Sequence, residues 1–126
     1  MKSYIVSVFK KEEEIKRIIE NIRKYSFDEL NRHPHFELSV MEKLANINEI
    51  KETYPKFELV KSIELRENEK GQKYYSLNYE LDDGTFIVLS LVLEREKPLI
   101  INAFHVNRNY KKFEKSLKKN YSRKFI

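Results

Sequence analysis

The residues of this chain that could take part in chemistry gather near its C-terminal end. Residues 99–119, LIINAFHVNRNYKKFEKSLKK, run from an apolar stretch through His105, Arg108 and Lys111 into a basic segment. Cleaving RNA without a metal needs one group to take the 2′-hydroxyl proton, another to protonate the leaving oxygen, and cations to stabilise the charged intermediate. Histidine, lysine and arginine can fill these roles. The same residues are equally typical of a strand end followed by a solvated helix.

Most of the net charge of the chain also lies at this end. Residues 108–126 contain eight Lys and Arg against one acidic residue, a sum of +7, whereas the whole chain carries +5. Residues 1–107 therefore sum to −2, and such an uneven distribution favours a surface that faces a polyanion. The residues expected to contact nucleic acid are His105, Lys112, Lys115, Lys118, Lys119 and Arg123. A Lys-rich, solvated helix with a frayed tail explains the same charges equally well.

A further histidine with a possible chemical role lies far from this stretch in the sequence. His35 follows Pro34, and proline favours the first turn of a helix. Partial positive charge collects at the start of a helix. An imidazole in that place could take or give a proton, and it could equally be an ordinary helix-start residue.

The composition excludes several other kinds of site. The chain has 126 residues, which is enough for one domain, residues 1–126, with a real core. It contains no cysteine and three histidines, so disulfides, zinc–thiolate sites and thiol nucleophiles are excluded. No glycine-rich nucleotide-binding loop and no calcium-binding spacing occurs. We therefore expect no metal and no cofactor.

Hydropathy and the N-terminal residues indicate a soluble, cytoplasmic protein. The longest apolar runs, such as FIVL and LVL, are far shorter than the ~20 residues of a membrane helix, so no membrane partner is expected. The N-terminal sequence MKSYIVSVFKKEEE lacks the longer apolar region and the cleavage site of a signal peptide. The many Lys, Glu, Ile and Tyr residues resemble the usage of thermophile proteins.

Helical patterns occupy the first half of the chain. Apolar residues at helical spacing predict a helix over residues 10–25 and another that begins at Pro34. Capping boxes that start at Ser26 and Asn46 predict two further short helices. Residues 2–9 alternate only weakly, and are compatible with a strand or with the first turns of a helix.

From Phe57 onward the apolar period changes to two, which predicts strands. The four strands are expected over residues 57–66, 73–81, 85–93 and 99–106. The sequence DDG at residues 82–84 is a hairpin signal, and a helix is expected from about Asn109 to Lys119. The predicted fold class is therefore α+β, with N-terminal helices, a four-stranded antiparallel meander and a C-terminal basic helix.

Alternation along the last predicted strand separates two of the candidate residues. It places Asn102 on one face and His105 on the other, because successive side chains of a strand point to opposite faces. His105 is expected to share its face with Leu99, Ile101 and Ala103. These apolar neighbours favour a packed histidine over a catalytic one.

Two stretches of the sequence resemble a known superfamily. FDELNRHPHFELSVMEKLANINEI joins a helix-borne His to F-x-L-S and an apolar helix, and LIINAFHVNRNYKK is similar to a last strand that runs into a basic segment. With the apolar strand GTFIVLSLVLE, they resemble small toxin-like domains of the barnase–EndoU–colicin–RelE ribonuclease superfamily. The resemblance covers roughly residues 26–113 and implies the same α+β fold.

The resemblance also implies a function and a site. The function would be that of a metal-independent ribonuclease, often the toxin of a prokaryotic toxin–antitoxin pair, with RNA as substrate and a protein antitoxin as partner. Family-type catalytic residues would correspond to His35, Asn102, Arg108 and Lys111.

Two other functions stay open on the sequence. One is a non-catalytic nucleic-acid-binding module that uses the basic helix, with Tyr121 or Phe125 available to stack on bases. The other is a protein-interaction or accessory protein without catalysis, whose interface would be the Tyr-rich face of the sheet. The sequence does not indicate an oligomeric state.

Overall fold

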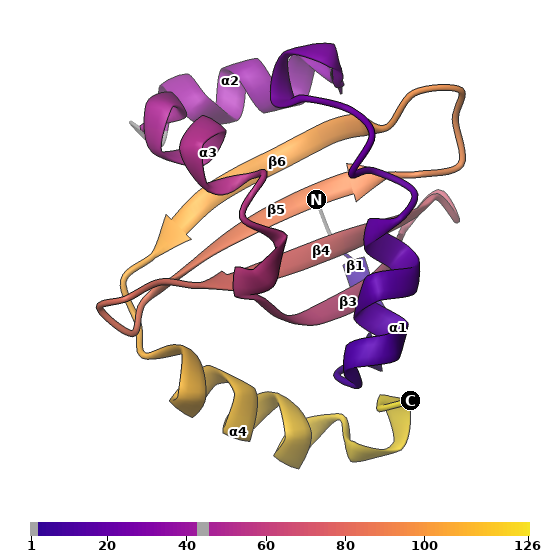
Figure 1. Cartoon of the computed structure of the whole chain (residues 1–126). Coiled ribbons are helices and arrows are strands. Elements are labelled where there is room, and N and C mark those ends of the chain that lie inside the picture. Colours follow the sequence, from indigo (N-terminus) through magenta and orange to yellow (C-terminus); the bar gives the residue numbers. More distant parts are fainter. Residues whose placement is uncertain (1–2, 43–45) are drawn as a thin grey trace.

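Figure 1 shows the computed structural model of the chain, which describes residues 3–42 and 46–126. The strands are β1 (Ser3–Phe9), β2 (Asn31–Arg32), β3 (Val60–Asn68), β4 (Lys73–Glu80), β5 (Phe86–Val92) and β6 (Leu99–Val106). The helices are α1 (Glu12–Ile19), α2 (Pro34–Glu42), α3 (Ile47–Thr53) and α4 (Tyr110–Asn120). Short 3₁₀ turns lie at Phe27–Glu29, Phe57–Leu59 and Ser122–Lys124. The predicted α+β class is confirmed.

The described strands form one mixed sheet in the order β1-β3-β4-β5-β6-β2. The four strands β3 to β6 are antiparallel neighbours in sequence order, but the prediction that they make up the whole sheet was wrong. β1 adds antiparallel to β3, and β2 adds parallel to β6. β2 is too short to give a sequence pattern, and the register of β1 shifts between Ile5 and Ser7, which breaks its alternation.

Three helices cover one face of the sheet. In Figure 1, α1 lies in front of the strands and α2 lies beside β6. Their apolar side chains pack on the odd-numbered residues of the central strands, among them Ile63, Leu77 and Leu89. The predicted strand from residue 57 begins at Val60, because residues 57–59 form a 3₁₀ turn.

A tyrosine fixes the chain that runs between these helices. The hydroxyl of Tyr54, just after α3, donates at 3.1 Å to the carbonyl of Ile22 and lies 2.9 Å from that of Tyr25. The hydroxyl of Tyr79 on β4 donates to the carbonyl of Tyr54 at 2.9 Å. Buried hydroxyls with partners cost little, so the core tolerates these polar atoms.

The opposite face of the sheet is covered only in part. α4 packs on one end of it, where Phe86 contacts Tyr110 and Phe113 with ring centroids 5.5 and 4.7 Å apart. Farther along α4, Leu117 packs against Ile5 and Val8 of β1. Among the described residues no helix covers the rest of this face, which we call the open face.

A bulge in β6 corrects one prediction about its faces. Asn102 pairs with Ser90 but Ile100 pairs with Leu91, so Ile101 is an extra residue in the strand. Leu99 and Ile101 therefore lie on the open face, in a small cluster with Tyr74 and Val92. Alternation had predicted that Leu99 and Ile101 share the face of His105, and this prediction was wrong.

Candidate nucleic-acid interface

The N-terminal end of α4 is held firmly against the sheet. The side chain of Asn109 caps the helix by accepting a hydrogen bond from the backbone of Lys112 at 3.1 Å. The backbone of Tyr110 donates to the carbonyl of Gly84 at 2.7 Å. The hydroxyl of Tyr110 lies 2.7 Å from that of Ser62, and burial raises its pKa. These contacts set which side of α4 faces solvent.

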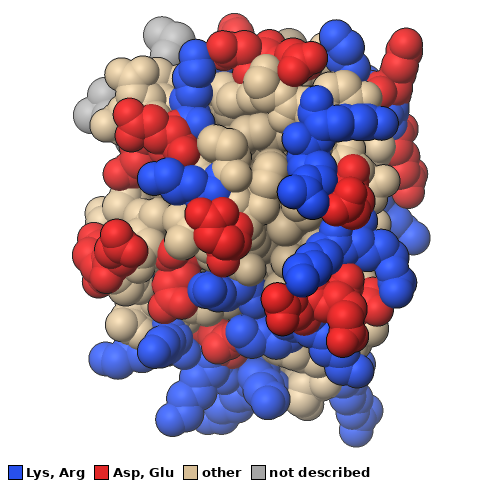
Figure 2. Space-filling view, in the orientation of Figure 1, with Lys and Arg blue, Asp and Glu red and all other residues tan. Residues whose placement is uncertain are grey.

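The exposed side of α4 carries a stripe of lysines. Lys111, Lys112, Lys115, Lys118 and Lys119 are all exposed. At 3.6 residues per turn their spacing keeps them within an arc of about 120°, away from the buried Tyr110 and Leu117. In Figure 2, Lys and Arg side chains gather at the end of the molecule where α4 lies. We call these five residues the lysine stripe.

Within the part of the chain that the structure describes, the cations of this region have no acidic partners. The eight Lys and Arg side chains of residues 108–124 form no ion pair with any acidic side chain that the structure describes. The one acidic residue of α4, Glu114, pairs instead with Lys10, which lies outside the helix. The positive potential of the stripe is therefore not cancelled locally.

Beside α4 the open face is hollowed into a depression of about 370 Å³. Its aromatic and apolar lining comes from Tyr74, Phe86, Val88, Phe104, Val106 and Phe113. Its polar lining comes from Glu64, Arg66, Ser76, Ser90, Asn102 and Arg108. We call this hollow the sheet-face depression. Asn102 and Arg108, two of the residues predicted to be catalytic, therefore lie in one place.

An ion pair between a buried glutamate and a half-buried arginine lies in this depression. Glu64 is 2% exposed, and its Oε1 accepts from Nε and Nη2 of Arg66 at 2.9 and 2.6 Å. Its other oxygen accepts from the side-chain amide of Asn78 at 2.9 Å. The guanidinium of Arg66 also donates to the hydroxyl of Ser3 at 3.2 Å. The carboxylate is thus satisfied, and it holds Arg66 in one orientation.

His105 has a structural environment on the helix-covered face. Its Nδ1 lies 3.0 Å from Oε1 of Glu49 on α3, and its Nε2 lies 2.7 Å from the hydroxyl of Thr85. That hydroxyl donates to Asp83 at 2.5 Å, and this hydrogen bond is the main cause of the lowered pKa of Asp83. Both ring nitrogens of His105 therefore have hydrogen-bond partners within the protein.

The structure does not bring His35 together with Arg108. His35 is exposed in the first turn of α2, and its backbone donates to Nδ1 of His33 at 2.9 Å. The backbone of His33 donates to the carbonyl of Ile100, near the start of β6. Arg108 follows the other end of β6, roughly 20 Å farther along at the usual rise of a strand. The two residues also lie on opposite sides of the sheet, because α2 packs on the helix-covered face.

The remaining predicted residues divide in two groups. Lys111, Lys112, Lys115, Lys118 and Lys119 lie together in the lysine stripe, whereas Arg123 is exposed in the 3₁₀ turn beyond α4. Sequence reasoning missed Glu64, Arg66, Ser76 and Ser90. A signal existed for all of them but Ser90, because polar residues alternate with apolar ones along β3 and β4, whereas Ser90 is the one polar residue of β5.

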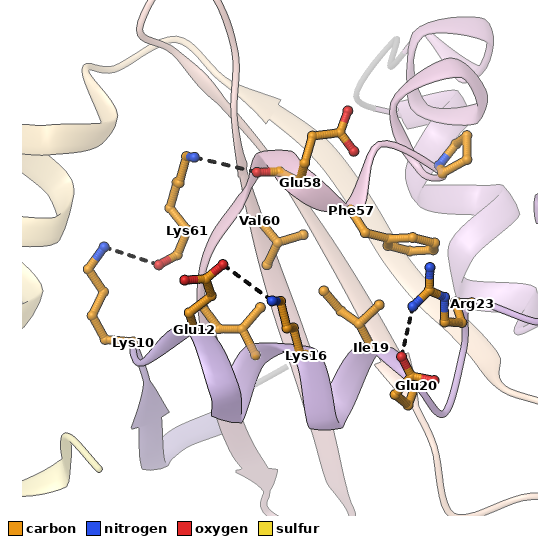
Figure 3. A pocket seen from close by; sticks show the side chains of 12 residues that line it. Lys10, Glu12, Lys16, Ile19, Glu20, Arg23, Phe57, Glu58, Val60 and Lys61 are labelled. Carbon is orange, nitrogen blue, oxygen red and sulfur yellow. Dashed lines mark hydrogen bonds and ion pairs between the residues drawn. The ribbon is translucent and has the colours of Figure 1, made fainter.

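A second hollow lies on the other face, and its charges are balanced. Figure 3 shows this groove of about 490 Å³ between α1 and the start of β3, floored by Ile19, Phe57 and Val60. The charged side chains around it pair with one another, Lys16 with Glu12 at 3.5 Å and Arg23 with Glu20 at 2.8 Å. Because acidic and basic residues alternate at its rim, the groove is not a polyanion surface like the lysine stripe.

The described residues contain neither a cluster of metal ligands nor a helix that could span a membrane. Within residues 3–42 and 46–126 no three His, Asp or Glu side chains are placed to hold a metal ion. No helix in the same part of the chain has the length and apolar character needed to cross a membrane.

Comparison of this chain with family models, with curated proteins and with solved structures finds no match in any of the three.

Proposed function

We propose that this chain binds RNA along the lysine stripe and the adjoining open face of its sheet. The observation that carries the proposal is the stripe itself, five cations on one side of α4 without an acidic partner among the described residues. Cations gathered in this way release bound counterions when a polyanion replaces them, which favours binding. The choice of RNA among polyanions rests on the resemblance of residues 26–113 to ribonuclease domains.

Salt dependence tests this proposal directly. The affinity for a fluorescein-labelled single-stranded RNA is measured by anisotropy between about 50 and 200 mM salt, where phosphate contacts give a steep decline. The double variant Lys115→Gln/Lys118→Gln should bind more weakly, and its log–log slope should fall by about 1.4, because each contact contributes about 0.7 for single strands.

A variant with the same net charge separates this effect from general electrostatics. Lys56→Gln/Lys73→Gln removes two exposed cations elsewhere that have no described ion pair. The slope of its log affinity against log salt concentration should equal that of the unmodified chain. Equal slopes for both double variants, or no RNA binding by the folded chain, would count against the proposal.

A metal-independent ribonuclease is the second candidate function. The observation that favours it is that Asn102 and Arg108 share the sheet-face depression with Glu64 and Arg66. In such a site the Glu64 carboxylate can accept a proton, and the guanidinium of Arg108 at the edge of the depression can hold the phosphate. A toxin role and a protein antitoxin belong to this candidate through the sequence resemblance alone.

Cleavage of RNA in the presence of EDTA tests the second candidate. Arg108→Gln should abolish cleavage, whereas His35→Ala should retain it. His35 lies near the start of β6 and Arg108 follows its end, so the two residues do not share a site. Cleavage lost in His35→Ala would contradict this location of the site. A folded chain that binds RNA without cleaving it would remove the ribonuclease and leave RNA binding in place.

A further inference from the structure

Two hollows adjoin at the N-terminal end of α4, and they differ in chemistry. One is the sheet-face depression. The other, of about 410 Å³, is lined by Arg108, Asn109, Lys112, Phe113 and Ser116. Arg108 and Phe113 line both. A single ring and a single guanidinium thus lie at the boundary between an aromatic hollow and a cationic one.

The sheet-face depression suits a flat, uncharged group. The half-buried rings of Phe104 and Phe113 supply apolar surfaces, with the buried Phe86 packed behind Phe113, and every nucleobase has a π-face that stacks on such rings. The Glu64 and Arg66 charges cancel one another at close range. A phosphate does not fit here, because it would meet the Glu64 carboxylate.

Hydrogen-bonding groups line the same depression. The hydroxyls of Ser76 and Ser90 lie 2.8 Å apart on neighbouring strands. That contact uses one of their two protons, so one O–H is left to donate, and both oxygens keep lone pairs. The carboxamide of Asn102 lines the depression as well. The edge of a nucleobase needs this mixture of donors and acceptors.

The hollow that Arg108, Asn109 and Lys112 line suits a phosphate. Arg108 and Lys112 have no ion-pair partner among the described residues. Both line this hollow, and no acidic side chain does. Guanidinium groups bind phosphate through paired N–H donors, and lysine does so as a point charge.

We infer that the two hollows form one nucleotide-binding site, in which an unpaired base of an RNA strand enters the sheet-face depression and its phosphate lies against Arg108 and Lys112. This inference rests on the proposed RNA binding and specifies its substrate. The strand must be unpaired at this nucleotide, because a base within a duplex is stacked on its neighbours and cannot enter. The rest of the lysine stripe then holds the neighbouring phosphates.

A side chain that fills the depression tests the inference. Val88 lines the depression and is half-buried, so Val88→Trp places an indole where the base would lie. Leu38→Trp adds the same ring at an exposed position on α2, 54% exposed, and serves as the control. Affinities are measured for a labelled 12-nucleotide single strand and for the 12-base-pair duplex, with urea unfolding of each variant as the check on folding.

The unmodified chain and Leu38→Trp should prefer the single strand by about tenfold, the usual scale of one stacked base. Val88→Trp should lose this preference and keep the affinity for the duplex. Equal affinity of the unmodified chain for both RNAs, or a preference that survives in Val88→Trp, would overturn the inference and leave the proposed RNA binding standing. Failure to bind either RNA would overturn both.

A second readout tests the phosphate position without relying on a filled depression. Adenosine monophosphate, adenosine and inorganic phosphate are titrated against the labelled chain by NMR. The nucleotide should shift the backbone amides of residues 88–90 and 102–108 together. Arg108→Gln/Lys112→Gln should weaken this binding severalfold, whereas Lys118→Gln/Lys119→Gln, which removes the same charge, should not. Equal weakening by both, or shifts from the nucleotide only outside these residues, would overturn the inference.

Discussion

Nδ1 of His105 on β6 lies 3.0 Å from Oε1 of Glu49 on α3, so a residue that the sequence places at an RNA surface instead ties a helix to the sheet. The Thr85 hydroxyl holds the other ring nitrogen at 2.7 Å. Glu49 is 39% exposed, and the charge of the pair therefore contributes little. The hydrogen bonds give His105 its structural value.

His105→Ala should lower the free energy of unfolding by about 1 kcal/mol, the usual net contribution of such hydrogen bonds. It should leave RNA affinity unchanged, because the ring lies on the helix-covered face. Urea unfolding and anisotropy measure the two effects. His35→Ala, an exposed histidine, should change neither, and a loss of RNA affinity in His105→Ala would contradict the assignment.

Tyr54 makes stability fall at alkaline pH. Burial, with a smaller contribution from Glu29, raises its pKa to about 12 from an ordinary value of about 10. Between these values the unfolded chain loses the phenolic proton while the folded chain keeps it. The unfolded state then binds fewer protons, so stability decreases as pH rises through this window.

The variant Tyr54→Phe should be less stable at pH 7 by about 1 kcal/mol, because its hydrogen-bonded hydroxyl is lost. Between pH 10 and 12 the free energy of unfolding of this variant should decline less steeply than that of the unmodified chain. Burial also raises the pKa of Tyr79 and of Tyr110. These two tyrosines therefore still contribute part of the decline in stability. Urea unfolding at a series of pH values measures it, and an unchanged slope would refute the role of Tyr54.

The Glu64–Arg66 pair should show strong coupling. Arg66→Met leaves a carboxylate that is 3% exposed with only its remaining hydrogen bond from Asn78, and should cost about 3 kcal/mol. The double variant Glu64→Gln/Arg66→Met removes the stranded charge and should be more stable than Arg66→Met alone. A double-mutant cycle in urea measures the coupling, and additive losses would show that the pair is not coupled.

Alanine substitutions at the two glycines of the chain distinguish the effect of backbone strain from an effect on α4. Gly71 and Gly84 have φ of +80° and +86°, so alanine at either should cost about 1–2 kcal/mol. An added Cβ at Gly84 would also lie 3.3 Å from Nδ2 of Asn109, the cap of α4, whereas at Gly71 it meets nothing within 4 Å. Gly84→Ala should therefore weaken RNA binding as well as stability. Equal RNA affinities in the two variants would contradict a role for this cap.

Local signals in the sequence predicted much of the fold. The strands that alternation predicts after Phe57, although the first begins only at Val60, the DDG turn and the buried side of α4 all appear in the structure, because each depends on residues close in the chain. The capping box at Ser26 is present as well, although it starts a 3₁₀ turn rather than an α-helix. A bulge at Ile101 and the short parallel strand β2 depend on distant partners, and alternation cannot show either.

The candidate site was predictable only in part for the same reason. The lysine stripe is a property of one helix, so its spacing was visible in the sequence. The sheet-face depression joins Glu64, Ser76, Ser90 and Asn102 from four strands. These polar residues gain meaning as a group only when it is known which face of the sheet the helices leave uncovered. His35 and Arg108 resembled one site because sequence order does not reveal that β6 separates them.

The strand order has a consequence for how the molecule assembles. The strands β3, β4 and β5 each pair with the next strand along the chain, whereas β1 pairs Ser3 with Asn68, across more than half of the sequence. Closing that long loop costs more chain entropy than closing a hairpin. We therefore expect pulsed hydrogen exchange to show β4 and β5 protected before β1. Until β1 docks, the outer edge of β3 is unpaired, and an unpaired edge is where a folding chain can join to another copy of itself.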